Sequence, residues 1–214
     1  AHRGLLLRLL TPKRLAENEA FIWSLVDQQT DEFLPTGRCE VVRELGGPFT
    51  MLVIADLLGV PESDHEWFIE AMGRRGGHIG GTGGSTMAKT PLEVLYDRFV
   101  EYLEDRRRAP RGDVLTGLAT ATFADGSIPE AGDVAKIASN LFAAGQETTI
   151  RLLGTAFLRI AEDAELQQRL RDDHTLIPNF IEECLRHESP VKGDFRLNRV
   201  TTTVGGVELP AGTT

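Results

Sequence analysis

The feature of this sequence that most constrains its fold is a long helical stretch whose middle breaks the apolar pattern. Pro129 opens a helix that we expect to run to about Ala161. Apolar residues flank the middle on both sides, but residues 143–149 read AAGQETT. A glycine inside a helix costs about 1 kcal/mol relative to alanine, and two adjacent β-branched threonines add to the strain. Such a weak point often accompanies a local bulge near a functional site.

One face of this expected helix carries small, polar and charged residues in place of large apolar ones. Side chains three and four positions apart share a face, which here groups Asn140, Ala143, Ala144, Glu147, Thr148 and Arg151. The adjoining faces would pack into a core through Val134, Ile137, Leu141, Phe142, Leu152, Leu153 and Phe157. Two interpretations stay open. The small residues make room for a flat, bulky group, or they only let another helix cross closely, with Glu147 in a structural ion pair.

Helical signals dominate the rest of the chain. Thr11 and Pro12 form an N-cap and first helical position, which predicts a helix to about Leu34. Residues 48–59 are apolar nearly all round, as in a buried helix. Further helices are expected around Trp67, over 91–108, after a turn at 110–113, and over 164–173 and 176–188. After Pro190 the pattern is β-like, with a hairpin turn at Gly205-Gly206. The fold class is mainly α with a small β annex.

Two short segments invite a binding interpretation. Seven glycines lie between Gly73 and Gly84, but the P-loop pattern G-x-x-x-x-G-K-[ST] is missing, so a mobile connector or lid is expected there. Residues 106–108 are three arginines in the last turn of a helix. Cations are favoured at that end of the helix dipole, so a solvated helix end is expected, with a basic docking patch as the alternative.

Composition narrows the class of protein. The 214 residues carry a net charge of −9, which disfavours nucleic acid and anionic membranes as partners. No apolar run approaches the roughly 20 residues that a membrane-spanning helix needs. The two cysteines, Cys39 and Cys184, lie far apart and form no disulfide framework or C-x-x-C metal pair. We therefore expect a cytoplasmic protein in a reducing compartment, without nucleic-acid or membrane partners.

A second motif lies after the long helix. Glu183 and Arg186 are three positions apart on an expected helix, so their side chains can pair. Such an E-x-x-R pair is common and is usually a surface ion pair worth at most about 1 kcal/mol. Its setting is more informative, because a proline break and a glycine-turned hairpin come after it.

Together these residues resemble the middle of a bacterial cytochrome P450, a haem-thiolate monooxygenase. Residues 144–148, AGQET, resemble the family's A-G-x-[D/E]-T motif, and residues 183–186 resemble its E-x-x-R motif. DLLGVP at 56–61 and GGVELPAGT at 205–213 stand in the matching order. The resemblance implies one partial P450 domain over 1–214, from mid helix C to the strands after helix K. Because the sequence starts within an amphipathic helix and stops after a strand and turn, we expect a fold incomplete at both ends.

The resemblance also implies roles for single residues. Ala144 and Gly145 would leave room for dioxygen and substrate beside the haem. Thr148 would hydrogen-bond the bound oxygen, and Glu147 would relay protons. Arg3 and Arg196 would pair with the haem propionates. The remaining implied positions are Asn140, Ala143, Val191 and Lys192 facing substrate, Glu183 and Arg186 as structural residues, and the glycine-rich 73–84 as a lid.

One departure from the family concerns the iron. The family's ligand is a cysteine in an F-x-x-G-x-H-x-C-x-G loop, and no such segment is present in residues 1–214. Cys39 and Cys184 are expected to be ordinary buried thiols. No metal ligand is therefore expected in this chain; the cysteine ligand is expected beyond Thr214, and the chain alone is expected to be inactive.

The implied function is a haem b-dependent monooxygenase (iron protoporphyrin IX) that hydroxylates an apolar small molecule with O2. Electrons would come from NAD(P)H through a ferredoxin reductase and a ferredoxin. The alternative is a truncated, non-catalytic helical scaffold that lacks the haem ligand. A haem sensor with a histidine ligand is disfavoured, because all five histidines lie at ends, in loops or in polar surroundings: His2, His65, His78, His174 and His187.

Overall fold

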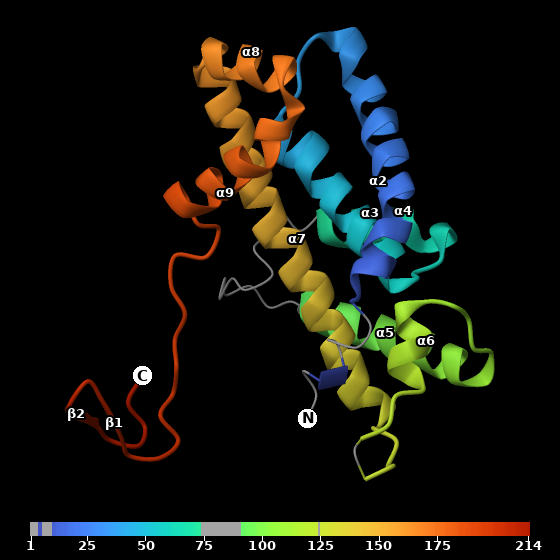
Figure 1. Ribbon diagram of the computed structural model, residues 1–214. Helices are drawn as coiled ribbons and strands as arrows, with labels where there is room; N and C mark the ends of the chain where they lie inside the picture. The colour runs from blue at the N-terminus through green and yellow to red at the C-terminus, as the bar shows by residue number, and fades with distance from the viewer. Residues whose placement is uncertain (1–3, 6–9, 74–90, 124) are drawn as a thin grey trace.

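The computed structural model describes residues 4–5, 10–73, 91–123 and 125–214, which form α-helices and one small antiparallel sheet. The α-helices are α2 (Pro12–Phe33), α3 (Gly47–Leu58), α4 (His65–Gly73), α5 (Pro91–Arg108), α6 (Val114–Ala119), α7 (Ala131–Glu162), α8 (Ala164–Asp172) and α9 (Ile177–His187) (Figure 1). The strands are β1 (Thr202–Val204) and β2 (Val207–Leu209), and a π-helix spans Val41–Gly46. The predicted fold class, mainly α with a small β annex, is confirmed.

Helix α7 runs through the middle of the helical part, with α3 and α5 packed against it (Figure 1). Phe142 of α7 is fully buried and stacks against Phe68 of α4 and Phe99 of α5, with ring centroids 5.0 and 6.0 Å apart. Val134 and Ala138 extend the buried side of α7 toward its N-terminus. These contacts fix the long helix on one side and leave its other side free of the core.

Local sequence signals determine several element boundaries. The Thr11 hydroxyl accepts a hydrogen bond from the Arg14 amide at 3.3 Å and caps α2 as predicted. Asp113 caps α6 by accepting from the Thr116 amide at 2.7 Å. The β1–β2 turn places Gly205 and Gly206 at φ values of 58° and 83°, which glycine adopts readily in a two-residue hairpin. The predicted starts of α2 and α6 and the predicted hairpin are therefore confirmed, and the long helix α7 begins at Ala131, two residues after the predicted start at Pro129.

The expected solvated arginine cluster at the end of α5 is wrong for Arg106 but holds for Arg107 and Arg108, which are exposed. Arg106 is only 1% exposed; its Nε donates to Asp113 at 2.6 Å and its Nη2 to the Gly59 carbonyl at 2.8 Å. Arg107 donates to the carbonyls of Ala119 and Pro129 at 3.0 and 2.6 Å. The end of α3 and the start of α6 cover Arg106, so this cation bonds to a carbonyl and to carboxylates rather than to water.

Two further expectations about α7 need correction. The helix is an uninterrupted α-helix through residue 145, without the expected bulge; a π-helix forms at Val41–Gly46 instead. Phe157 was expected in the core but is 40% exposed, and Leu152 and Leu153 are only half-buried. Most of the expected glycine-rich lid, residues 74–84, lies outside the described residues.

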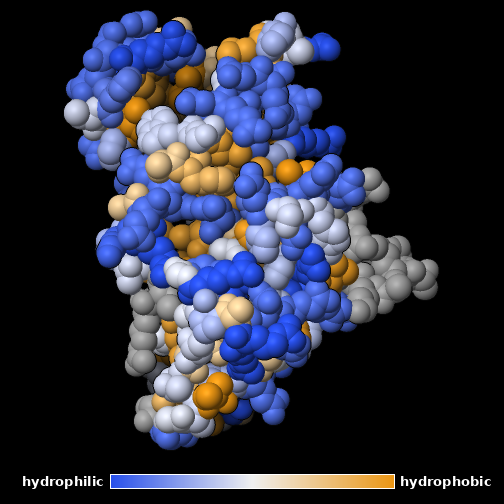
Figure 2. Space-filling view, turned by 90° about the vertical axis from the view of Figure 1, so that its right-hand side faces the viewer, coloured by the Kyte–Doolittle hydropathy of each residue, from blue (hydrophilic) through white to orange (hydrophobic). Residues whose placement is uncertain are grey.

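The surface is mixed in character. Figure 2 shows hydrophobic patches that reach the surface between hydrophilic side chains, and Trp23 and Leu34 are among the exposed large apolar residues. Within the described ranges, no helix combines the length and apolarity needed to cross a membrane.

Candidate functional site

The predicted strip of small and polar residues lies on the side of α7 that faces away from the core. Asn140, Ala144 and Arg151 are exposed and Thr148 is half-buried, whereas Gln146, on the opposite side, is buried. A helix that is apolar at both ends thus presents a shallow, small-residue surface at its middle. The sequence pattern predicted this face correctly.

Gly145 serves a close helix crossing. A Cβ atom at this position would lie 3.3 Å from Cδ1 of Ile54, a buried residue of α3. That distance is tighter than ordinary van der Waals contact, so the missing side chain lets α3 approach α7. The crossing interpretation therefore holds at Gly145. Ala144 next to it lies on the side of α7 that faces away from the core, together with Asn140, Glu147, Thr148 and Arg151, and we call this side the open face.

The polar groups on the open face bond along the helix. The Thr148 hydroxyl donates to the Ala144 carbonyl at 2.8 Å, a back-bond that a threonine in a helix commonly makes. Nη2 of Arg151 donates to Oε1 of Glu147 at 2.5 Å, and its Nη1 lies 3.4 Å from the Pro190 carbonyl oxygen. The expected structural ion pair of Glu147 is therefore present, on the same face as Thr148.

The second motif forms a two-point ion pair on α9. Nε and Nη2 of Arg186 donate to the two carboxylate oxygens of Glu183 at 2.7 and 2.5 Å. These hydrogen bonds lower the pKa of the Glu183 carboxyl, because they stabilise its charged form. Both side chains are exposed, so the pair is available to other groups that approach α9.

The chain is similar to known proteins along nearly all of its length, although no protein-family model matches it. It is 33% identical to cytochrome P450 144 of Mycobacterium tuberculosis over 98% of its length, which is 49% of that relative. Its structure superimposes on substrate-free cytochrome P450 CYP150A6 of Mycobacterium marinum with a TM-score of 0.84 and 53% identity, covering 99% of this chain and 48% of the other.

The chain belongs to the cytochrome P450 family. A further structural neighbour is CYP109E1 of Bacillus megaterium in complex with testosterone, with a TM-score of 0.82 and 27% identity over 99% of this chain and 57% of the other. The chain spans about half the length of the curated relatives that it matches. The P450 resemblance predicted from the two motifs is thereby confirmed.

The open face of α7 fits one side of a haem in a P450. Ala144 and Thr148 are small, and the described residues do not bury them, so a flat macrocycle can lie against the helix there. The iron ligand is a different matter. Cys184 is buried within α9 and Cys39 is half-buried, burial raises the pKa of both thiols, and the described residues hold no cluster of metal-ligating side chains.

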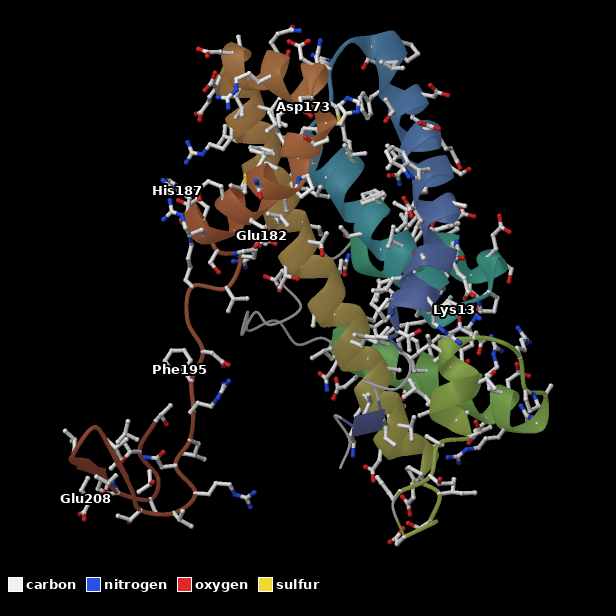
Figure 3. All side chains as sticks on the ribbon, in the orientation of Figure 1. Lys13, Asp173, Glu182, His187, Phe195 and Glu208 are labelled. Carbon is white, nitrogen blue, oxygen red and sulfur yellow. The ribbon has the colours of Figure 1, made fainter. Side chains whose placement is uncertain are left out.

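The remaining predicted residues are spread over the segment after α9. Val191 is exposed, Lys192 pairs with Glu188 at 2.5 Å, and Arg196 forms an ion pair with Asp194. The part of this segment that carries Phe195 runs apart from α7 (Figure 3). Arg3 lies outside the described residues. The structure therefore brings together the α7 residues, while Arg196 lies in the segment after α9, paired with Asp194. The role predicted for Arg3 and Arg196 at the propionates stays a prediction.

Sequence reasoning missed two features of this region. A groove of about 620 Å³ lies between α7, α8 and α9, and its lining includes Arg159, Leu170, Phe180, Glu183 and Cys184. The amphipathic pattern of α9 was the available signal for it. The contact between Arg151 and Pro190 was also missed, and no local pattern marks it, because the two residues are 39 positions apart.

Proposed function

We propose that the protein is a haem b-dependent monooxygenase that hydroxylates an apolar small molecule with O2. Residues 1–214 would form its part from mid helix C to the strands after helix K. The single observation that carries the proposal is the open face of α7, where Ala144, Glu147 and Thr148 of the A-G-x-[D/E]-T motif lie outside the core. Membership of the P450 family supports it.

Haem, when bound, would supply the iron at which dioxygen is activated. Ala144 leaves space against the helix, and Thr148 offers a hydroxyl whose proton can turn from the Ala144 carbonyl toward a ligand on the open face. Glu147 holds a carboxylate one residue away that can accept and return protons. Arg196 and Arg3 would hold propionate groups through charge-assisted hydrogen bonds.

The substrate would be an apolar small molecule. This class is favoured because a structural neighbour binds testosterone and because Val191 presents an exposed apolar side chain after α9. Asn140, Ala143 and Lys192 would complete the substrate-facing set. Electrons would come from NAD(P)H through a ferredoxin reductase and a ferredoxin.

The first test is the reading frame downstream of Thr214. An F-x-x-G-x-H-x-C-x-G segment within the next hundred or so codons would supply the thiolate. The expressed protein should then bind haem and give the carbon monoxide difference spectrum of a thiolate-ligated iron. A frame that ends at Thr214 would refute the monooxygenase proposal and favour a non-catalytic helical scaffold.

A further inference from the structure

Arg151 is the residue of α7 that joins the A-G-x-[D/E]-T motif to another part of the chain. Its Nη2 donates to Oε1 of Glu147 at 2.5 Å, and its Nη1 reaches toward the Pro190 carbonyl at 3.4 Å. The planar guanidinium presents these two N–H groups in a fixed fork. Glu147 and the backbone at Pro190 are thus held by one rigid group.

The contact at Pro190 is structurally important because it lies at the start of the segment after α9. Among the residues that the structure describes, it is the only hydrogen bond between α7 and the chain after α9. Val191 and Lys192, the proposed substrate-facing residues, come directly after Pro190 in the sequence. The extended segment farther along runs apart from α7 (Figure 3). Arg151 is therefore the residue of α7 that bonds to the start of this segment, which the Lys192–Glu188 ion pair also ties to the end of α9.

The contact at Glu147 has a complementary consequence. Arg151 anchors only Oε1, and the described residues form no hydrogen bond to Oε2. One carboxylate oxygen is fixed while the other stays available to exchange a proton. An exposed ion pair between residues four apart contributes little to stability. Helix stabilisation therefore does not account for the second contact of the Arg151 guanidinium, to the Pro190 carbonyl.

We propose that Arg151 is a positioning residue that fixes the Glu147 carboxylate and the backbone of residues 190–192 relative to each other. Through it, the placement of the segment that faces substrate and the orientation of the proton-relay carboxylate are coupled. This inference rests on the proposed monooxygenase function for the proton relay, but its geometric part does not.

The test compares three variants of the protein expressed from its complete reading frame. Arg151→Gln removes the charge and the fork, and Arg151→Lys keeps the charge but offers a single ammonium group. Arg159→Gln is the matched control, because Arg159 lies on the same helix, has a similarly exposed side chain (41% against 45%) and pairs with Glu162 at 3.2 Å. Crystal structures of the variants give the positions of the Glu147 carboxylate and the Pro190 carbonyl. NAD(P)H oxidation without substrate, with a ferredoxin and a ferredoxin reductase added, gives the fraction of electrons lost as peroxide.

In Arg151→Gln we expect the Glu147 carboxylate and the Pro190 carbonyl both to move and the peroxide fraction to rise several-fold. Arg151→Lys should keep one contact and give an intermediate fraction, and Arg159→Gln should match the wild type. If both groups stay in place in Arg151→Gln, or if they move without changing the peroxide fraction, the inference is overturned. A wild type without haem-dependent NAD(P)H oxidation would instead overturn the proposed function, while the crystal structures would still decide the geometric part.

Discussion

At the scale of single residues, the open face of α7 answers why a buried helix places polar side chains at its middle. Gly145 and Ala144 are adjacent small residues with different neighbours. Gly145 admits Ile54 of α3, and Ala144 stays uncovered. Thr148 lies one turn beyond Ala144 and bonds to its carbonyl at 2.8 Å. Close helix crossing and an accessible polar face are therefore both present, on different sides of the same helical turn.

The hydroxyl of Thr148 is the group on this face with a definite predicted effect. In the protein from the complete reading frame, Thr148→Ala should raise the peroxide released per NAD(P)H consumed, because a proton donor to the reacting oxygen is lost. General acid–base groups contribute roughly 100-fold or more to such steps. Peroxide and product yields measure the effect. Thr148→Ser should retain most of the coupling, and Thr149→Ala is the control at the neighbouring position; unchanged coupling in Thr148→Ala would count against the proton relay.

At the scale of elements, one polar junction joins α3, α5 and α6. Arg106, buried at the end of α5, bonds to Asp113 at the start of α6 and to the Gly59 carbonyl at the end of α3. Gly59 has a φ of 89°, and a Cβ added there would lie 2.3 Å from Cβ of Asp113. The left-handed backbone and the crowding both require glycine at this position.

A paired glycine substitution tests this junction. Gly59→Ala should destabilise the protein by about 2–4 kcal/mol, from roughly 1–2 kcal/mol of backbone strain and a similar cost of overpacking. Gly37→Ala is the control, because Gly37 also has a positive φ of 66° but has no atom within 4 Å of the added Cβ. It should cost only about 1–2 kcal/mol. Denaturant unfolding of both variants gives the comparison, and equal losses would show that the Asp113 contact is unimportant.

A second junction, between α5 and Asp64 in the 3-10 turn just before α4, makes stability depend on pH. Asp64 accepts hydrogen bonds from Tyr102 at 2.5 Å and Arg98 at 2.8 Å. Burial alone would raise the pKa of Asp64, but these partners outweigh it and the net pKa is lowered. A lowered pKa gives stability that is present above the unfolded value of about 3.9 and is lost as pH falls through the folded value.

Removing the Tyr102 hydroxyl should therefore lower the free energy of unfolding at neutral pH, and lower it by less in acid. Tyr102→Phe should cost about 1–2 kcal/mol at pH 7, and its difference from the wild type should shrink as the pH falls below about 3.9 and through the lowered pKa of Asp64 in the folded protein. Urea unfolding at a series of pH values measures this. Tyr96→Phe, the same change on the same helix, should show no such pH dependence. If Tyr102→Phe loses the same unfolding free energy in acid as at pH 7, the result contradicts the role of Asp64.

How far the sequence predicted these elements depends on the range of the interactions involved. Thr11 capped α2 and Gly205-Gly206 turned the hairpin as expected, because a few neighbouring residues decide caps and turns. The helical period also placed Ala144 and Thr148 on one face. Arg106 was misjudged because its partner at Gly59 is 47 positions away, and the Arg151–Pro190 contact was missed for the same reason. Interactions that depend on how helices pack leave no local pattern.

At the scale of the whole molecule, the described part has two unlike regions. Around α7, the helices α3 to α6 form a core with many fully buried side chains, among them Leu58, Phe99 and Leu115. The segment after α9 is different, because Phe195 is 85% exposed and both strands of the hairpin are almost entirely exposed. Clustered exposed apolar residues mark surfaces that pack against another part of a protein. This is consistent with a chain that spans about half the length of its relatives.

This contrast predicts how a polypeptide of residues 1–214 unfolds on its own. Without a cofactor, it should melt broadly and without a sharp cooperative transition, because the segment after α9 and the open face of α7 are not held by the core that binds α3, α5 and α6. Circular dichroism and calorimetry should give a calorimetric enthalpy that differs from the van't Hoff value. The protein from the complete reading frame, loaded with haem, should melt cooperatively. A sharp two-state transition in the 214-residue polypeptide would show that the exposed face needs no cover, and the non-catalytic helical scaffold would then be the better account of this chain.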